Sequence, residues 1–148
     1  MINFPFMSKQ LVLMDHDGGV DDYLATMLLL TMDHIEIIMC PLDLTNNVPV
    51  TSQLVQKMGR QRHYPISDLA GQCYALVIPQ DYYFWDVLAT AYLAHPEFYK
   101  LREWETEILT TGLSQGRTKV VSGGRKIYAM DQVDKEAFYA YILQQWAR

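Results

Sequence analysis

The sequence predicts an α/β fold with a Rossmann-like parallel sheet flanked by helices and a C-terminal β-hairpin. Two apolar runs, Leu11–Met14 and Ile35–Met39, have the length and composition of buried parallel strands. From Asp21 onward, apolar residues recur at helical spacing, so the two runs and the helix between them form a βαβ unit. Near the other end of the chain, Gly123-Gly124 separates two extended segments, as a hairpin turn does.

The elements that follow the βαβ unit are predicted from turn and capping residues. Asn46-Asn47 is a turn signal. Thr51 is suited to cap a helix that carries Leu54, Val55 and Met58. The next segment, Arg60–Asp68, is polar and contains a proline, so we expect a loop there.

The C-terminal part is predicted to hold a helix, three strands and a last helix. Val87–Ala94 is helical in pattern and stops before Pro96. The three extended segments are Glu105–Thr111, Arg117–Ser122 and Lys126–Met130. We expect the last two to pair across Gly123-Gly124. Asp134 then caps a helix whose buried stripe is Phe138, Tyr141 and Ile142.

Composition narrows the class of protein. The chain has 148 residues and a formal net charge of −5, without a run of basic residues, so we expect no nucleic-acid partner. Only two cysteines occur, and neither a signal peptide nor a membrane span is recognisable, which favours a cytoplasmic protein without a membrane partner. We expect one domain over residues 1–148, with residues 1–39 as the N-terminal unit and 40–148 as the C-terminal part.

An acidic motif follows the first predicted strand. Asp15 and Asp17 stand at the end of this strand, Gly18-Gly19 turns the chain, and Asp21 and Asp22 open the helix. Carboxylates at this density repel one another unless a cation lies among them. Oxygen ligands suit Ca²⁺ or Mg²⁺, and ligands of open α/β sheets bind at the carboxyl ends of strands. The motif therefore predicts a metal site.

Two other interpretations do not involve an enzyme. The first is a solvated acidic turn before a capped helix, but four acids in so short a stretch exceed what capping requires. An EF-hand loop is excluded because the glycines lie at the wrong offset and Thr26 occupies the position of the bidentate glutamate.

One enzymatic interpretation is a resemblance to the haloacid-dehalogenase-like phosphatases. Their first motif, Asp-x-Asp-Gly after an apolar strand, is matched by Asp15–Gly18. This resemblance implies Asp15 as nucleophile and Asp17 as general acid and base, with Mg²⁺. Gly19 stands where that family has Thr or Val, and the later acidic pair would have to be Asp131 and Asp134.

The whole motif resembles more closely that of the inosine-uridine-type nucleoside hydrolases, which carry Asp-x-Asp-x-Gly-x-Asp-Asp after the first strand. Three later segments also resemble the family, in family order. Pro41–Asn46 is similar to its "PLDvT" strand and turn, Phe84–Leu88 to the helix start with a late metal-binding Asp, and Thr111–Thr118 to its "G-x-x-T/S-x-G-x-T" strand pair. The resemblance implies a nucleoside-hydrolase-like sheet and hydrolysis of the N-glycosidic bond of ribonucleosides.

The resemblance also implies the roles of single residues. Asp17, Asp22 and Asp86 would ligate Ca²⁺, and Asp17 would take a proton from the metal-bound water. Asp21 would bind the ribose hydroxyls, and Asp15 would support the ligands. Taken alone, Asp86 is equally suited to be a helix N-cap.

The residue before Asp86 is Trp85, where some family members have the His that protonates the leaving base. Trp85 is suited to stack on the nucleobase or to serve as an apolar anchor.

The match also implies an abbreviated family member. Family members are longer, and the stretch without a counterpart falls near Met39-Cys40. A sheet with fewer strands leaves an edge open, so we expect a homo-oligomer. A catalytically inactive scaffold that keeps the metal site is the non-enzymatic alternative.

Overall fold

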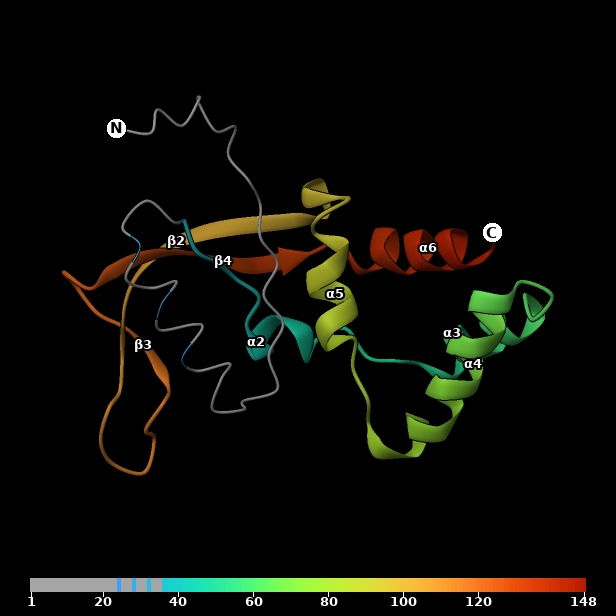
Figure 1. Ribbon diagram of the computed structural model, residues 1–148, viewed down its shortest axis with the longest axis horizontal. Coiled ribbons are helices and arrows are strands. Elements are labelled where there is room, and N and C mark those ends of the chain that lie inside the picture. Colours follow the sequence, from blue (N-terminus) through green and yellow to red (C-terminus); the bar gives the residue numbers. More distant parts are fainter. Residues whose placement is uncertain (1–23, 25–27, 29–31, 33–35) are drawn as a thin grey trace, which may run out of the picture. The chain divides into compact units, whose positions relative to one another are not determined.

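The computed structural model of the chain is shown in Figure 1, and it describes Leu24, Leu28, Met32 and residues 36–148. The chain divides into two units, Met1–Ile35 and Glu36–Arg148. The first predicted strand and the acidic motif lie outside the described residues. Leu24 and Leu28 are helical, as the periodicity from Asp21 predicts.

The second unit contains the elements that bear on the candidate site. In chain order these are β1 (Ile38–Met39), α2 (Leu42–Thr45), α3 (Ser52–Arg60), α4 (Pro65–Val77), α5 (Trp85–Ala91), β2 (Tyr99–Ile108), β3 (Thr118–Val120), β4 (Arg125–Val133) and α6 (Lys135–Trp146). Within the described part of the chain, none of these helices has the length and apolar character needed to cross a bilayer.

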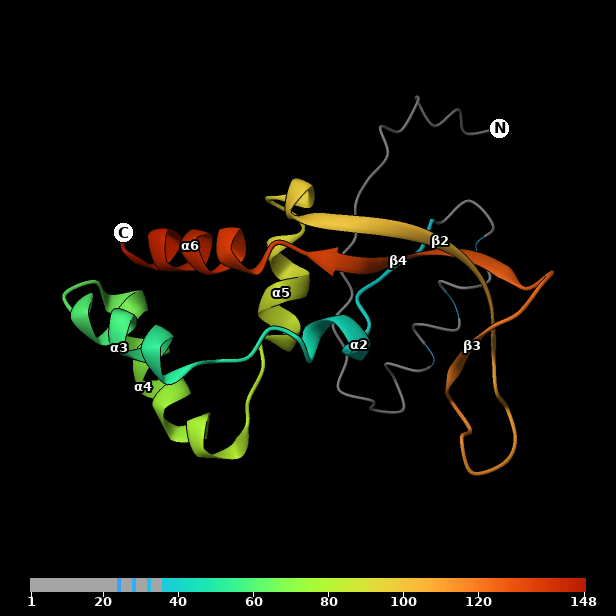
Figure 2. The same ribbon diagram turned by 180° about the vertical axis from the view of Figure 1, so that it is seen from behind.

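The strands form a mixed sheet in the order β1-β4-β2-β3. The short strand β1 runs parallel to β4, with Ile38 opposite Tyr128, and the other pairs are antiparallel. The two long strands β2 and β4 lie at its centre, and Figure 2 shows the same arrangement from behind. The predicted α/β class is confirmed, and the described sheet contains one parallel pair.

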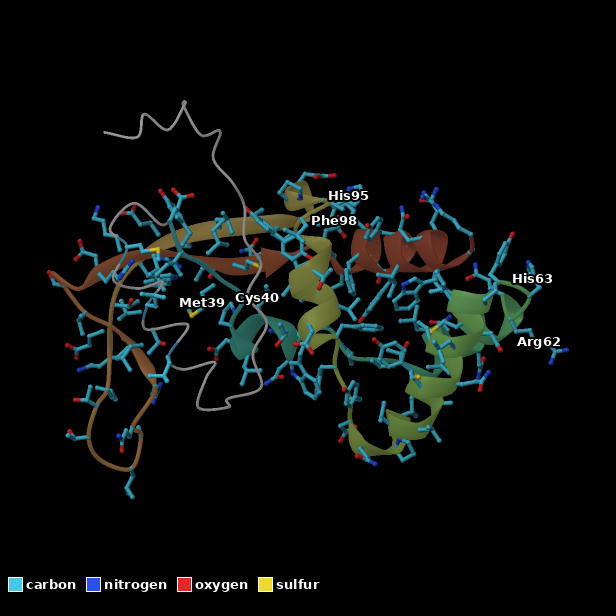
Figure 3. All side chains as sticks on the ribbon, in the orientation of Figure 1. Met39, Cys40, Arg62, His63, His95 and Phe98 are labelled. Carbon is cyan, nitrogen blue, oxygen red and sulfur yellow. The ribbon has the colours of Figure 1, made fainter. Side chains whose placement is uncertain are left out.

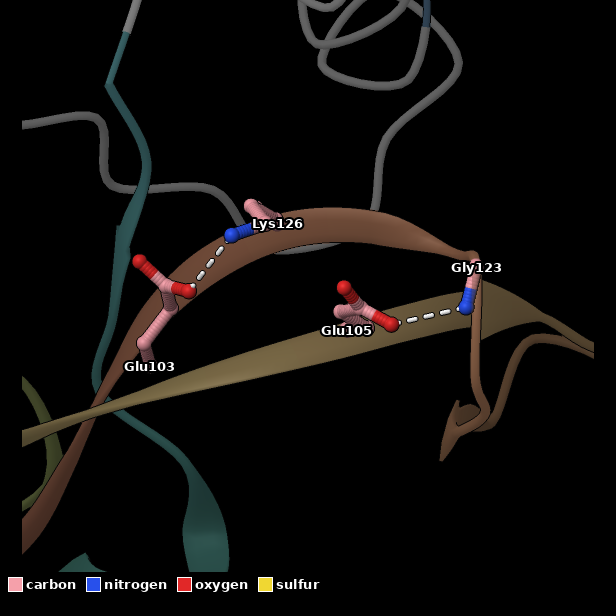
Figure 4. A network of polar contacts seen from close by, with 4 residues as sticks. All are labelled: Glu103, Glu105, Gly123 and Lys126. Carbon is pink, nitrogen blue, oxygen red and sulfur yellow. Dashed lines mark hydrogen bonds and ion pairs between the residues drawn. The ribbon is translucent and has the colours of Figure 1, made fainter.

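The C-terminal hairpin is formed by different strands from those predicted. β3 pairs with β2, where Ile108 lies opposite Thr118, and β4 pairs with the other edge of β2. The Gly123-Gly124 turn therefore carries the chain from one side of β2 to the other, and the prediction that it joins two paired strands is wrong. Glu105 on β2 accepts a hydrogen bond from the Gly123 N–H at 2.7 Å, which fixes this turn (Figure 4).

Sequence patterns located some helices and missed others. Thr51 caps α3 as predicted, because its hydroxyl accepts a hydrogen bond from the Leu54 N–H at 3.2 Å. The expected loop Arg60–Asp68 is wrong at its end, since Pro65 opens α4. The resemblance implies a strand and turn over Pro41–Asn46, but Leu42–Thr45 is a short helix that leads into the turn.

The core of the unit lies between the helices and the sheet. Its fully buried apolar members come from α3, α5 and α6 and from the segments that precede α3 and α5; they are Val48, Met58, Phe84, Leu88 and Phe138. α3, α4 and α6 pack together beyond the end of the sheet (Figure 1). The His95 ring stacks on Phe98 with centroids 4.6 Å apart, which closes the turn between α5 and β2 (Figure 3).

Gly124 lies where the turn packs against β2, so a substitution at this position tests that packing. A Cβ at this position would lie 2.5 Å from the backbone oxygen of Thr106, which belongs to a central strand and cannot move easily. We expect Gly124→Ala to lower the free energy of unfolding by about 1–3 kcal/mol in urea denaturation.

Gly59 supplies the matched control for this substitution. It lies in α3, and a Cβ there meets no atom within 4 Å. Gly59→Ala should raise the stability by up to about 1 kcal/mol, because alanine is the better helix former. Equal effects of the two substitutions would contradict the close approach of the turn to β2.

Candidate functional site

The start of α5 is held by an irregular segment from another part of the chain. The Val50 N–H donates to the Tyr82 carbonyl at 2.9 Å, and the Phe84 N–H donates to the Val48 carbonyl at 3.0 Å. Phe84 itself is buried in the core and provides the N-cap position of α5. These contacts determine where the next two residues, Trp85 and Asp86, are placed.

Asp86 lies in the first turn of α5 and is exposed. The N-cap residue is Phe84, so the interpretation of Asp86 as the helix cap is wrong. A carboxylate in a first turn is favoured by the helix dipole. Its exposed oxygens leave Asp86 available to a ligand.

Cys40, which follows β1, interacts electrostatically with Asp86. Burial raises the pKa of the Cys40 thiol, the negative charge of Asp86 adds to this shift, and the pKa reaches about 11. Cys40 directly follows β1, and Figure 3 shows it beside Met39, the last residue of that strand. The charge of Asp86 therefore interacts with the residue that directly follows β1.

Trp85 is held in a defined orientation by polar and aromatic contacts. Its indole Nε1–H donates to Oδ1 of Asn46 at 2.9 Å. The Tyr82 ring meets the indole edge-on at a centroid distance of 4.7 Å, and the Tyr83 ring lies 5.7 Å away. Because the indole has only one N–H, this donor is already used.

Asn46 is a site residue that sequence reasoning missed. The sequence predicts Asn46 only as part of a turn, and this turn is confirmed. Its partner Trp85 is 39 positions away in the chain, so no local spacing relates the two. The element after β1 and the start of α5 are thus linked by this side-chain hydrogen bond.

Of the predicted metal ligands, Asp86 alone belongs to the described residues. Asp15, Asp17, Asp21 and Asp22 lie outside the described residues. Among the residues that are described, no three His, Cys, Asp or Glu side chains gather in a way that would hold a metal ion.

The phosphatase interpretation requires Asp131 and Asp134 as an acidic pair, but these two residues lie in different surroundings. Asp134 caps α6, where its carboxylate accepts a hydrogen bond from the Ala137 N–H at 3.0 Å. Asp131 lines a hollow of about 470 Å³, which also includes Met39, Leu42 and Trp104. Neither Trp85 nor Asp86 lines this hollow.

Three solved structures that are similar to this chain belong to one family. No protein-family model and no curated protein matches the sequence. Among solved structures, an inosine-uridine preferring nucleoside hydrolase from Bacillus anthracis is similar, with a TM-score of 0.73 and 32% identity. The similarity covers 84% of this chain and 40% of that one.

Two more distant structures share the fold. A purine-preferring ribonucleoside hydrolase from Gardnerella vaginalis has a TM-score of 0.60 at 15% identity, covering 76% of this chain and 40% of that one. A plant nucleoside hydrolase has a TM-score of 0.58 at 14% identity, covering 76% and 41%. The chain therefore belongs to the nucleoside hydrolase family, as its motifs predict, and it spans about 40% of the length of the Bacillus anthracis enzyme.

Proposed function

We propose that this chain takes part in hydrolysis of the N-glycosidic bond of ribonucleosides. The observation that carries the proposal is its 32% identity, over 84% of its length, with an inosine-uridine preferring nucleoside hydrolase. The local geometry supports it, since Trp85 and Asp86 stand together at the start of α5. A small-molecule nucleoside is the partner that this proposal implies.

We further propose that Asp86 binds Ca²⁺ together with Asp17 and Asp22. Carboxylate oxygens are the hard ligands that this ion prefers. Asp86 fits such a role because its carboxylate is exposed in the first turn of α5. The proposal requires Asp17 and Asp22 to come within reach of Asp86, which a calcium titration tests.

The remaining roles concern proton transfer and charge. When bound, the calcium would make a water molecule more acidic and attract the sugar hydroxyls. Asp17 accepts a proton from the attacking water, whose oxygen forms a bond to the anomeric carbon as the bond to the base breaks. Asp21 accepts hydrogen bonds from the ribose hydroxyls, and Asp15 supports the ligands. The carboxylates stabilise the positive charge that develops on the sugar.

Departure of the base has to be assisted by a group other than residue 85. An indole N–H is not an acid at neutral pH, and that of Trp85 is engaged by Asn46 at 2.9 Å. We propose that Trp85 contributes to binding of the base, by stacking, instead of protonating it.

The proposed activity is tested by measuring free base and ribose released from inosine and uridine, with calcium and with a chelator. Calcium-dependent release of both products supports the proposal. Release of phosphate from p-nitrophenyl phosphate, without nucleoside cleavage, would favour the phosphatase interpretation. Calcium binding by calorimetry without turnover of either substrate would favour the inactive scaffold.

Trp85 gives a prediction on substrate binding. We expect Trp85→Ala to raise KM for the nucleoside by about 5–100-fold, the usual effect of losing an aromatic ring that stacks on a base. Trp85→Phe should keep most of the affinity.

Trp104 is the matched control, because its ring is covered by the Arg102 guanidinium 4.4 Å from the ring centroid. Trp104→Phe should leave KM unchanged. If Trp85→Ala lowers the melting temperature and leaves KM as it is, Trp85 is an apolar anchor and the proposed stacking is wrong.

A further inference from the structure

The side-chain hydrogen bond between Asn46 and Trp85 continues a series of backbone hydrogen bonds between two distant segments. In the last backbone bond of this series, the Phe84 N–H donates to the Val48 carbonyl at 3.0 Å. One residue further on, helix α5 begins, so the backbone of Trp85 belongs to the helix. The indole Nε1–H of Trp85 then donates to Oδ1 of Asn46 at 2.9 Å, which joins the two segments at the point where the backbone no longer does so.

The backbone of Asn46 is itself held in place. Asn46 is the C-cap residue of α2, and its N–H donates to the Leu42 carbonyl at 2.9 Å. The preceding residue, Thr45, is buried, whereas the side chain of Asn46 is exposed. Figure 1 shows α2 beside the start of α5. The Asn46 side chain therefore extends toward Trp85 from a backbone that has little freedom to move.

The chemistry of the two side chains determines how the Asn46 amide is oriented. An indole N–H can only donate, so its partner has to be the amide oxygen Oδ1 and not the amide nitrogen. The Nδ2 group of Asn46 then points away from the indole, and it makes no hydrogen bond to the residues that the structure describes. Toward Trp85, Asn46 thus acts as an acceptor, and an aspartate at this position would supply the same acceptor.

The aromatic contacts of Trp85 restrain the indole less strictly than this hydrogen bond does. The Tyr82 ring meets the indole at an interplanar angle of 71°, and the Tyr83 ring is tilted by 49°. Edge-on and tilted contacts are compatible with more than one orientation of the ring. A hydrogen bond with one donor and one acceptor fixes the direction of the N–H, and with it the plane of the indole.

We infer that Asn46 is a positioning residue, whose Oδ1 holds the Trp85 indole in the orientation in which it stacks on the base of the nucleoside. The inference rests on the proposed function, because stacking by Trp85 is part of that proposal. In this role Asn46 acts through Trp85 and does not itself touch the substrate. A ring that is already oriented loses less conformational freedom on binding, so the effect belongs in the affinity for the nucleoside.

Kinetics at saturating calcium test this role. Asn46→Ala should raise KM for the nucleoside by about 2–10-fold, the usual contribution of one hydrogen bond, with little change in kcat. Asn46→Asp should keep KM close to that of the unchanged chain, because it keeps the acceptor. Asn47→Ala is the matched control, since the amide of Asn47 donates to the Asp43 carbonyl and not to Trp85. It should leave KM unchanged.

A double-mutant cycle shows whether Asn46 acts through Trp85. Phenylalanine has no N–H, so adding Asn46→Ala to Trp85→Phe should cause no further rise in KM. An equal rise of KM in both backgrounds would overturn the inference, because Asn46 would then act independently of the indole. A loss of affinity in Asn46→Asp as large as that in Asn46→Ala would also overturn it, because the Nδ2 group would then be the part that matters.

Time-resolved fluorescence anisotropy measures the restraint of the indole without substrate. Trp104→Phe and Trp146→Phe together leave Trp85 as the one tryptophan of the chain. In this background, Asn46→Ala should add a fast decay from local motion of the ring, and Asn46→Asp and Asn47→Ala should not. Circular dichroism shows whether each variant keeps its fold.

The anisotropy separates this inference from the proposed function. An unchanged decay in Asn46→Ala would overturn the inference even in a chain that hydrolyses nucleosides. A faster decay in a chain that hydrolyses no nucleoside would support the hold of Asn46 on Trp85 and contradict the proposed function alone.

Discussion

Asp17→Asn is expected to lower the rate of nucleoside hydrolysis by about 10²–10⁴-fold, the usual contribution of a general base. Asparagine keeps the shape of the side chain and can no longer accept the proton of the attacking water. We expect the loss to appear in kcat at saturating calcium, and the circular dichroism spectrum and the melting temperature to stay close to those of the unchanged chain. Full activity of this variant would remove the proposed mechanism.

Asp86→Asn tests metal binding while it keeps Asp17, the proposed acceptor of the proton. Asp86 is exposed and does not cap α5, so its replacement should leave the helix intact. We expect a weaker affinity for calcium in calorimetry and activity that recovers when the calcium concentration is raised. Asp17→Asn should not recover in this way. If Asp86→Asn changes neither the affinity nor the calcium dependence, Asp86 is not a ligand.

Phe84→Ala is expected to have the largest effect on stability, a loss of about 3–5 kcal/mol in the free energy of unfolding. Phe84 is 1% exposed. Its ring lies 4.9 Å from that of Tyr74 and 5.4 Å from that of Phe138, so removal leaves a cavity where three elements meet. A domain of ordinary stability has only about 5–15 kcal/mol to lose.

Urea denaturation measures this loss, with Phe84→Leu as the conservative variant and Leu113→Ala as the exposed control. Phe84→Leu fills most of the volume and should lose less than half as much stability as Phe84→Ala. Leu113 has no buried surface, so its replacement should change stability by less than about 0.5 kcal/mol. Similar losses for the two Phe84 variants would show that the core adapts to the cavity.

Elements with a strong local signal were predicted well from the sequence. Thr51 and Asp134 each have a side chain of the length that caps a helix, and both do so. The apolar stripe of the last helix is also confirmed at Phe138 and Ile142, which are buried. Capping and periodicity depend on residues three or four positions apart, so they can be recognised without knowing the rest of the fold.

Helix α4 was missed because its signals were ambiguous. In the sequence, Pro65 indicates a loop, although proline is also favoured at the first position of a helix. The residues that follow are apolar on both faces, so they show no contrast between a buried and an exposed side.

The pairing of the last strands depended on contacts that local sequence does not contain. Gly123-Gly124 correctly marked a turn, and Gly123 has a positive φ of 79°. Glycines in a turn do not determine which strand lies beside which, because β2 provides hydrogen bonds to both of its neighbours. Long-range pairing, and with it the order of the sheet, had to come from the structure.

In the candidate site too, the sequence predicts what depends on neighbouring residues and misses what depends on distant ones. The position of Asp86 in the first turn of a helix followed from its motif, and the structure corrects only its role as a cap. The hydrogen bond between Trp85 and Asn46 depends on two segments that meet only in the folded chain. The metal site itself stays a prediction, since two of its proposed ligands, Asp17 and Asp22, lie outside the described residues.

The anchoring of the start of α5 to the last helix has a consequence for biosynthesis. Phe84 packs against Phe138, and the Tyr139 hydroxyl donates to the Pro49 carbonyl at 2.8 Å across 90 positions of the chain. A nascent polypeptide that has not yet left the ribosome as far as α6 cannot form either contact. Folding around Trp85 therefore waits until α6 has left the ribosome, and until then the emerging aromatic residues are exposed to chaperones.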